Sequence, residues 1–96
     1  MRQLPNDPLL VDQILDDRQK THGDFGEVSV IAQGIKTIIR DHAQLLSLDH
    51  REALDMIATK IARILSGDPE EPDHWRDIVG YATLALRSIQ NEDVDK

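Results

Sequence analysis

Two aspartates in the C-terminal third of the chain, Asp73 and Asp77, are four residues apart. On a helix this spacing puts both carboxylates on one face, where they repel each other unless a cation lies between them. Carboxylate oxygens are ligands that Mg²⁺ accepts. A role as the N-terminal cap explains Asp73 equally well, because the helix dipole favours an acid there, but it does not explain Asp77 in the second turn. The pair is therefore a candidate cation site.

The two aspartates belong to a helix that the sequence predicts over 72–90. Its core face is expected to hold a set of apolar residues at helical spacing: Trp75, Ile78, Val79, Ala82, Leu86 and Ile89. Beside this face runs a second, mostly polar stripe that contains one leucine: Asp73, Asp77, Tyr81, Leu84 and Ser88. An apolar residue within a polar stripe indicates that the stripe is covered by another subunit or by a ligand.

Three further helices are predicted, over 8–20, 26–46 and 49–66. Pro8 suits the first position of a helix, with Asp7 as its cap. Gly23 and Gly26 predict a turn after the first helix, and Gly67 a stop after the third. Short connections between four helices predict an all-α, four-helix bundle-like fold. We expect one domain over 1–96, with 1–7 and 91–96 flexible.

The helix over 49–66 has two distinct faces. At about 100° per residue, its buried side is expected to hold Leu54, Ile57, Ala58, Ile61, Ile64 and Leu65. The opposite stripe holds Glu52, Thr59 and Arg63, with Asp55 and Lys60 on its two shoulders. A solvated face with contacts between successive turns is one interpretation of this stripe, and a binding site is the other.

Composition excludes several classes of function. The net charge of −7 argues against binding of long nucleic acids, although a local cationic pocket for a small nucleotide remains compatible with it. The chain has no cysteine, which rules out disulfides, zinc–thiolate sites and thiol nucleophiles. No apolar run approaches the roughly 18 residues of a membrane span. The N-terminal residues lack the apolar stretch of a signal peptide. A cytoplasmic protein is therefore expected.

Three motifs carry a resemblance to a known group of proteins. They are K-T-H-G-D-F at 20–25, K-I-A-R-I-L-S-G at 60–67 and D-H-W-R-D-I-V-G-Y-A at 73–82. Together they resemble a family of small helical proteins encoded by phages and prophages, over about residues 14–86. A phage-encoded protein of this family would work in the host cytoplasm.

The layout of the helices is also distantly similar to that of the MazG-like all-α nucleoside triphosphate pyrophosphohydrolases. In those enzymes, carboxylates in E-x-x-E and E-x-x-D pairs on two helices hold Mg²⁺. The resemblance implies metal ligands at Glu52, Asp55 and Asp77, and it leaves Asp73 as the fourth candidate, because His74 stands where the second pair would begin with Glu.

The same resemblance implies residues that contact a nucleotide. Lys60 and Arg63 would neutralise phosphate charge, and Arg63 can do so with two parallel hydrogen bonds. His22 and Asp24 would close over a base or ribose, and Tyr81 or Trp75 would stack on a base. Some of these residues have a structural alternative: His22 as a turn cap, Lys60 as a surface lysine, and Trp75 or Tyr81 as a core residue.

Three functions follow from these observations. The first is a nucleotide-handling protein similar to the Mg²⁺-dependent pyrophosphohydrolases. The second is a non-catalytic nucleotide binder that sequesters a host signalling nucleotide. The third is a protein-interaction module that inhibits a host defence protein through its acidic surface. Because the domain is small and the last helix carries Leu84 in a polar stripe, we also expect a homo-oligomer, most simply a dimer.

Overall fold

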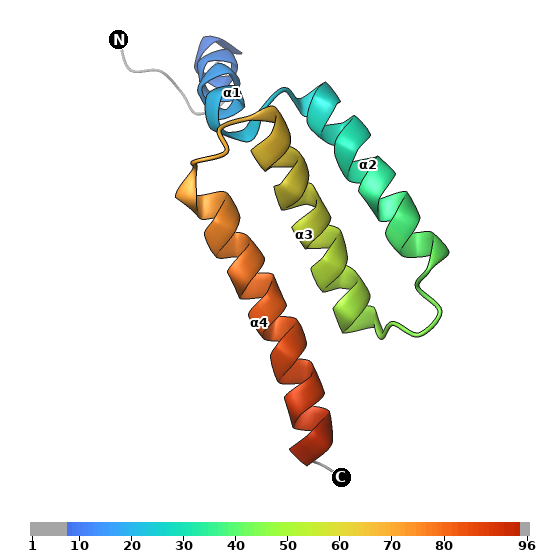
Figure 1. Cartoon of the computed structure of the whole chain (residues 1–96). Coiled ribbons are helices and arrows are strands. Elements are labelled where there is room, and N and C mark those ends of the chain that lie inside the picture. Colours follow the sequence, from blue (N-terminus) through green and yellow to red (C-terminus); the bar gives the residue numbers. More distant parts are fainter. Residues whose placement is uncertain (1–7, 95–96) are drawn as a thin grey trace.

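The computed structural model describes residues 8–94, which form four helices (Figure 1). These are α1 (Pro8–His22), α2 (Phe25–Asp41), α3 (Leu48–Ser66) and α4 (Pro72–Val94). No strand occurs within 8–94, so the expected all-α, bundle-like fold is confirmed. The flexibility expected for 1–7 concerns residues outside this range. The flexibility expected from 91 onward overlaps the end of α4, which continues to Val94.

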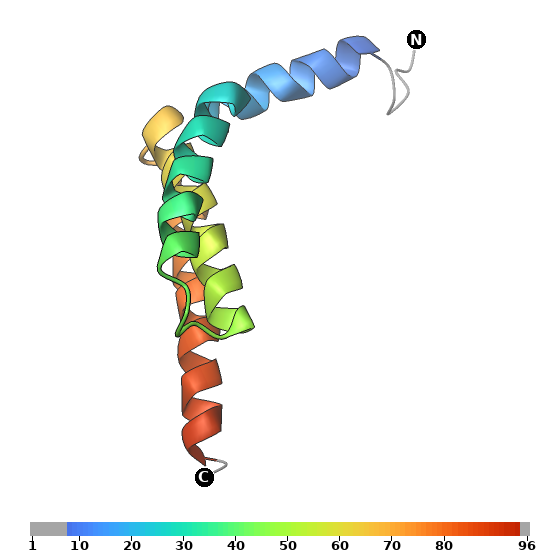
Figure 2. The ribbon, with the colours of Figure 1, turned by 90° about the vertical axis from the view of Figure 1, so that its right-hand side faces the viewer.

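Helices α2, α3 and α4 lie side by side, with α3 in the middle (Figure 1). Neighbouring helices run antiparallel because the connections between them are short. Seen from the side, the three helices make a layer one helix thick, and α1 projects from one end of it (Figure 2). A chain of 96 residues that folds compactly has a radius of gyration of about 12.5 Å. This one has a radius of gyration of 17.1 Å.

The buried core of the layer is small and lies along the two sides of α3. Val28 and Ala32 of α2 meet Ala62 of α3, with Ile31 packed beside them. Ala53 and Ala58 are also buried. Alanine keeps helix axes close and adds little apolar area, so this core is held by close backbone approach and by few large side chains.

Helix α3 is flanked by α2 on one side and by α4 on the other, so its two remaining faces contact neither of these helices. Lys60 points to α4, where it pairs with Asp77, and Ala62 points to α2. At about 100° per residue, one remaining face of α3 carries mainly apolar side chains, namely Leu54, Ile57, Ile61 and Leu65, with His50 near its N-terminal end. The opposite face carries Glu52, Thr59 and Arg63. The layer therefore has an apolar face and a polar face.

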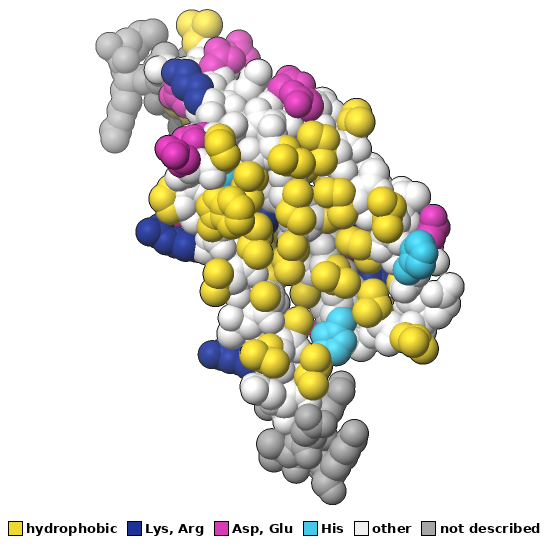
Figure 3. All heavy atoms as spheres, in the orientation of Figure 1, with side chains coloured by type: hydrophobic (Ala, Val, Ile, Leu, Met, Phe, Trp, Pro, Cys, Tyr) yellow, Lys and Arg dark blue, Asp and Glu magenta, His cyan; other side chains and the backbone are white. Residues whose placement is uncertain are grey.

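The apolar face extends over all three helices of the layer, and hydrophobic side chains cover it (Figure 3). The same wheel argument adds Ile31 and Ile38 from α2, and Trp75, Val79, Ala82, Leu86 and Ile89 from α4. Among these, Ile38, Leu54, Leu65, Trp75, Val79, Leu86 and Ile89 are exposed. The expectation that this side of α4 lies in the core is therefore wrong for the single chain.

Helix α1 leaves the layer on its polar side. Leu15 and Arg18 of α1 line the same pocket as Thr59 and Arg63 of α3, which belong to the polar face. The side view shows α1 extending away from the layer in that direction (Figure 2). Only the C-terminal end of α1 is anchored, and its apolar residues Leu9, Val11, Ile14 and Leu15 are exposed.

Three helix boundaries can be compared with the local signals in the sequence. Helix α3 begins after Ser47, whose side chain accepts a hydrogen bond from the backbone N–H of His50, and it ends at Gly67, as expected. Helix α2 ends at Asp41 and not near residue 46. The chain needs residues 42–47 to turn back along α3, and Leu45 in this loop is almost fully exposed.

Candidate anion-binding site

A pocket of about 440 Å³ lies in the corner between α1 and the polar face of the layer. Arg18 and His22 reach it from α1, Phe25 and Lys36 from α2, and Arg63 from α3. Gln19, Gln33, Ser29 and Thr59 add neutral hydrogen-bonding groups, and Val28 and Ala32 form part of its apolar floor. We call it the corner pocket.

The turn between α1 and α2 fixes the corner. Gly23 has φ +82°, and a side chain there would collide with Ser66 at the end of α3. A side chain at Gly67 would collide in the same way with the carbonyl oxygen of Thr21. The carbonyl oxygen of Thr21 accepts hydrogen bonds from the backbone N–H of Asp68 (3.1 Å) and from Nε2 of His74 (2.9 Å). The two glycines therefore let the end of α1 lie directly against the end of α3.

Two histidines, His22 and His74, pack against each other at this junction. His74 is only 1% exposed, and its ring meets that of His22 edge to face, with ring centroids 4.7 Å apart. Nδ1 of His22 lies 2.6 Å from the hydroxyl oxygen of Thr21. Burial, followed by the nearby positive charge of Arg18, lowers the pKa of His22 below its ordinary value of 6.5. His22 is therefore a neutral side chain at physiological pH.

Three cationic side chains converge on the corner pocket from three different helices: Arg18, Lys36 and Arg63. None of them forms an ion pair with a carboxylate within the part of the chain that the structure describes. Partial burial, and then the like charge of Arg18, lowers the pKa of Arg63, although the guanidinium stays protonated. In a protein with a net charge of −7, three cations against one carboxylate in the pocket lining make a local cationic site.

Asp24 is the carboxylate in the pocket lining, and it already has a structural role. It is the N-cap of α2, and its Oδ2 accepts a hydrogen bond of 3.0 Å from the backbone N–H of Glu27. Next to it, Phe25 is 82% exposed at the pocket. An aromatic ring that gains so little from burial is free to stack on a planar ligand.

Lys60 and Asp77 lie away from the corner pocket, between α3 and α4. Lys60 is buried, and its Nζ is 2.8 Å from Oδ2 of Asp77. The hydrogen bond and the positive charge of Lys60 lower the pKa of Asp77. The lysine therefore compensates the charge of Asp77, which the sequence assigned to a metal. Lys60 is buried and paired within the chain, and its predicted contact with phosphate stays a prediction.

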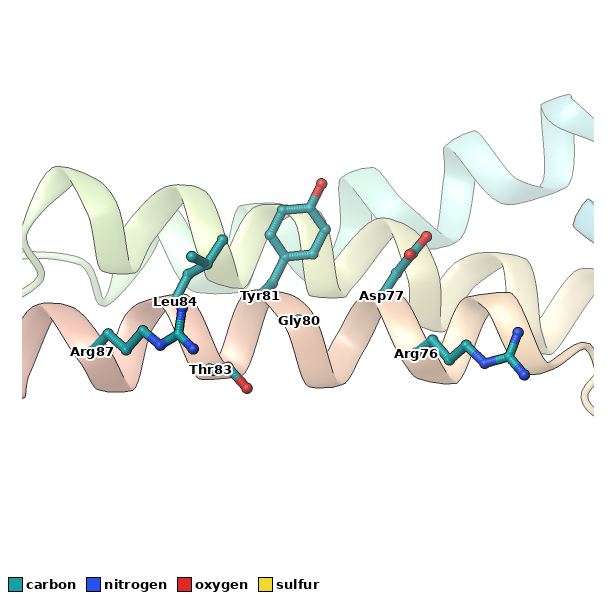
Figure 4. A pocket seen from close by; sticks show the side chains of 7 residues that line it. All are labelled: Arg76, Asp77, Gly80, Tyr81, Thr83, Leu84 and Arg87. Atoms are coloured by element: carbon teal, nitrogen blue, oxygen red, sulfur yellow. The ribbon is translucent and has the colours of Figure 1, made fainter.

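Tyr81 lines a separate, open groove of about 540 Å³ along α4. The side chains of Asp77, Tyr81 and Leu84 point to the same side of α4, and Arg76 and Arg87 lie at the two ends of the groove (Figure 4). Asp77 bonds to α3, as does Ser88, which donates to Asp49. Part of the stripe that was expected to contact a subunit or ligand is thus covered by α3.

The four predicted metal ligands do not converge within one chain. In residues 8–94 no three His, Asp or Glu side chains are close enough together to hold a metal ion. Asp73 pairs with the exposed Arg76 at 3.2 Å, and Asp77 pairs with Lys60. Glu52 is exposed and Asp55 half-buried, on the polar side of α3 that also carries Arg63. A metal role for these carboxylates stays a prediction.

The structure thus brings His22, Asp24 and Arg63 of the predicted ligand residues together and places Lys60 and Tyr81 elsewhere. Sequence reasoning missed Arg18, Lys36 and Phe25, which complete the pocket. Phe25 carried a signal, since it is the only phenylalanine and follows a turn. Arg18 and Lys36 carried none, because a single base on an exposed helix face is ordinary.

The fold and the pocket define a small all-α protein with a local cationic site. Residues 11–89 match the family model of a domain of unknown function, DUF6378, and the chain belongs to this family. No curated protein and no solved structure is significantly similar to it. Among the described helices, none combines the length and the apolar character that crossing a bilayer requires.

Proposed function

We propose that the protein binds a nucleotide in the corner pocket, with its phosphates against Arg18, Lys36 and Arg63. The observation that carries this proposal is the convergence of three unpaired cations from three helices in a chain that is acidic as a whole. Arg63 lies near the like charge of Arg18, Asp24 is the one carboxylate in the pocket lining, and an added anion relieves the repulsion between the cations. Two arginines favour phosphate, whose oxygens they bind in pairs.

The rest of the pocket fits the remainder of a nucleotide. A volume of about 440 Å³ lies within the usual range for small-molecule sites. Phe25 offers an exposed ring for a base, and Gln19 and Gln33 offer amides that can read its polar edge. His22, neutral at physiological pH, can donate to or accept from a ribose hydroxyl.

The similarity of the helix layout to the MazG-like enzymes supports the same ligand class. For a phage-encoded protein in the host cytoplasm, binding without turnover is enough to sequester a signalling nucleotide. The interaction-module function predicts no nucleotide affinity, so the experiment below separates the two.

The direct test is isothermal titration calorimetry with nucleoside mono-, di- and triphosphates, in the presence and absence of Mg²⁺. We expect R63Q to weaken nucleotide binding about 10-fold or more, because a charge-assisted hydrogen bond contributes roughly 1.5–3 kcal/mol. R87Q is the matched control, since Arg87 lies on α4 in the separate groove. Equal affinity in R63Q and wild type, or no binding of any nucleotide, would overturn the proposal.

Phe25 distinguishes a nucleotide from a simple anion. F25L should weaken nucleotide binding by about 5-fold or more, since stacking on one base contributes roughly 1–3 kcal/mol. It should leave the affinity for inorganic pyrophosphate unchanged. Because Phe25 is exposed, the substitution should not unfold the protein. A parallel loss for pyrophosphate would place the ring outside the base site.

A second candidate is Mg²⁺-dependent hydrolysis of the bound nucleotide. It is favoured by Glu52 and Asp55, which lie on the same side of α3 as Arg63, two to three turns away. Mg²⁺ is commonly held by one or two carboxylates plus substrate phosphates, and when bound it polarises a phosphoryl oxygen. Glu52 and Asp55 would hold it.

Release of pyrophosphate tests this second function. The measurement is a coupled assay with and without Mg²⁺ on the wild type, E52Q and D55N. Hydrolysis that depends on Mg²⁺ and is lost in both variants would support it. Tight nucleotide binding without any pyrophosphate release would leave the protein a binder only.

A further inference from the structure

The apolar face of the layer is too large for a stable monomer of this size. Seven large hydrophobic side chains on it are exposed, and they come from all three helices of the layer (Figure 3). Folded monomers seldom expose contiguous apolar patches beyond a few hundred Å². None of the four helices covers it, since α1 projects from the opposite side (Figure 2).

The total surface area leads to the same conclusion. The chain exposes 7326 Å². A folded monomer of 10.9 kDa is expected to expose about 5,600 Å², so the excess is about 1,700 Å². A standard interface buries about 800 Å² per partner, and obligate homodimers bury more. This excess includes the surface of the projecting helix α1, and it is larger than the area that one partner buries in a standard interface.

Helix α4 carries a pattern typical of helix pairing. Its apolar-face residues are separated by alternating steps of four and three: Trp75, Val79, Ala82, Leu86 and Ile89. Steps of this kind keep an apolar seam facing a partner helix. The seam is self-complementary in type, because it contains no charged residue and so presents no like-charge clash to a copy of itself.

We propose that the occupant of the apolar face is a second copy of this chain. Two layers pack face to face through their apolar faces and form one core between them. The corner pockets and the two α1 helices then lie on the outer sides of the dimer, pointing in opposite directions. The argument is independent of what the corner pocket binds.

The small core of the single chain favours a second copy over another partner. One chain alone buries five hydrophobic residues in the described range, and four of these are alanines. A core of that size does not supply the 5–15 kcal/mol of a typical folded domain. Covering the face therefore adds apolar burial that the single chain lacks, and a second copy of the chain is a partner that is always present where the protein is made.

Two leucines on α4 provide a matched test. Leu86 belongs to the apolar face and is 52% exposed, whereas Leu84 is on the opposite side of the same helix and is 58% exposed. Multi-angle light scattering at micromolar concentration should give twice the chain mass for the wild type and for L84E. L86E should be a monomer, because the substitution places a carboxylate in the seam.

Trp75 reports on the same face without any label. It is the only tryptophan, it lies on the seam and it is 52% exposed in the single chain. Iodide should quench its fluorescence weakly in the wild type and in L84E. In L86E, quenching should increase several-fold at concentrations where circular dichroism still shows helix. If L86E does not fold, quenching of Trp75 can be measured instead on the wild type, diluted until the dimer dissociates.

Several results would overturn the proposal. A monomeric wild type at 100 µM, with Trp75 freely quenched, would leave the face to a different partner. Dissociation by L84E together with an intact L86E dimer would move the interface to the groove of Tyr81. An L86E dimer in which Trp75 is freely quenched would exclude the seam from the interface.

Discussion

At the scale of single residues, the junction between α1 and α3 depends on Gly23. Its positive φ lies in a region that other residues adopt only with strain, and its missing side chain leaves space for Ser66. The Thr21 carbonyl, which accepts from His74, lies in the same junction. The geometry of the corner pocket thus rests on one residue that has no side chain.

We expect G23A to lower the free energy of unfolding by about 2–4 kcal/mol, through the strained φ and the collision with Ser66. G80A is the control: nothing lies within 4 Å of the added methyl group, so this mid-helix substitution should raise stability by about 0.5–1 kcal/mol. Urea denaturation measures both. A neutral G23A would show that the turn can rearrange.

His22 predicts how stability changes with pH. Its pKa in the folded protein is below 6.5, so the unfolded chain binds the proton more readily. The free energy of unfolding should therefore fall as pH drops through 6.5 toward the folded pKa, and it should not depend on His22 above about pH 7.5. The measurement is urea denaturation at several pH values.

H22Q should flatten this part of the pH profile, because glutamine does not titrate. H42Q is the control, since His42 lies at the exposed end of α2, far along the layer from the corner pocket. The explanation fails if the profiles of H22Q and wild type have the same slope between pH 7.5 and 5.5.

At the scale of helices, α3 and α4 are joined by a lysine that is buried and a carboxylate that is half exposed. Lys60 has few other groups to satisfy its charge, so Asp77 is needed wherever Lys60 is present. Removing one member of such a pair costs more than removing both, because it leaves an unpaired buried charge. This structural role competes directly with a role of Asp77 as a metal ligand.

We therefore expect D77N to lower the urea midpoint, and the double variant K60M/D77N to recover much of that loss. D17N is the control, since it removes only the exposed pair with Lys20 and should change stability by less than about 1 kcal/mol. If Asp77 served only a metal, D77N would be as stable as the wild type in the absence of metal, and the double variant would show no recovery.

At the scale of the whole molecule, the protein is an open layer with one projecting helix. It extends over 62 × 27 × 25 Å, where a compact domain of this length would be nearly isometric. An open layer buries apolar area on its helix flanks only and leaves a full face for association. Association then adds to the stability of the folded chain.

The melting temperature should for this reason increase with protein concentration. Mass action stabilises a folded dimer as the chain becomes more concentrated. Differential scanning calorimetry at 5 and 500 µM measures the effect, and we expect a rise of several degrees for the wild type and for L84E. A melting temperature that is the same at both concentrations would show that the single layer is stable alone.

The sequence predicted different parts of the fold and of the candidate site. The helix boundaries at Ser47 and Gly67 depend on local hydrogen bonds and were predictable. The end of α2 was not, because its apolar period continues into a loop that the return of the chain requires. Of the residues predicted to contact a nucleotide, His22, Asp24 and Arg63 line one pocket, whereas Arg18 of α1 and Lys36 of α2 join them only through the packing of three helices.

The sequence by itself determined that the protein is helical, where most helices begin and end, and which side of each helix is apolar, because all of these depend on neighbours within a few residues. Only the tertiary structure decided which of those apolar sides is buried. On α4, the polar stripe that contains Asp77 and Ser88 meets α3, and the apolar side with Trp75 and Leu86 stays exposed. The spacing of apolar residues along a helix shows which of its sides is the more apolar. Which side a neighbouring helix covers depends on the crossing of helices far apart in the chain, and a buried pair such as Lys60 and Asp77 can turn a polar side inward.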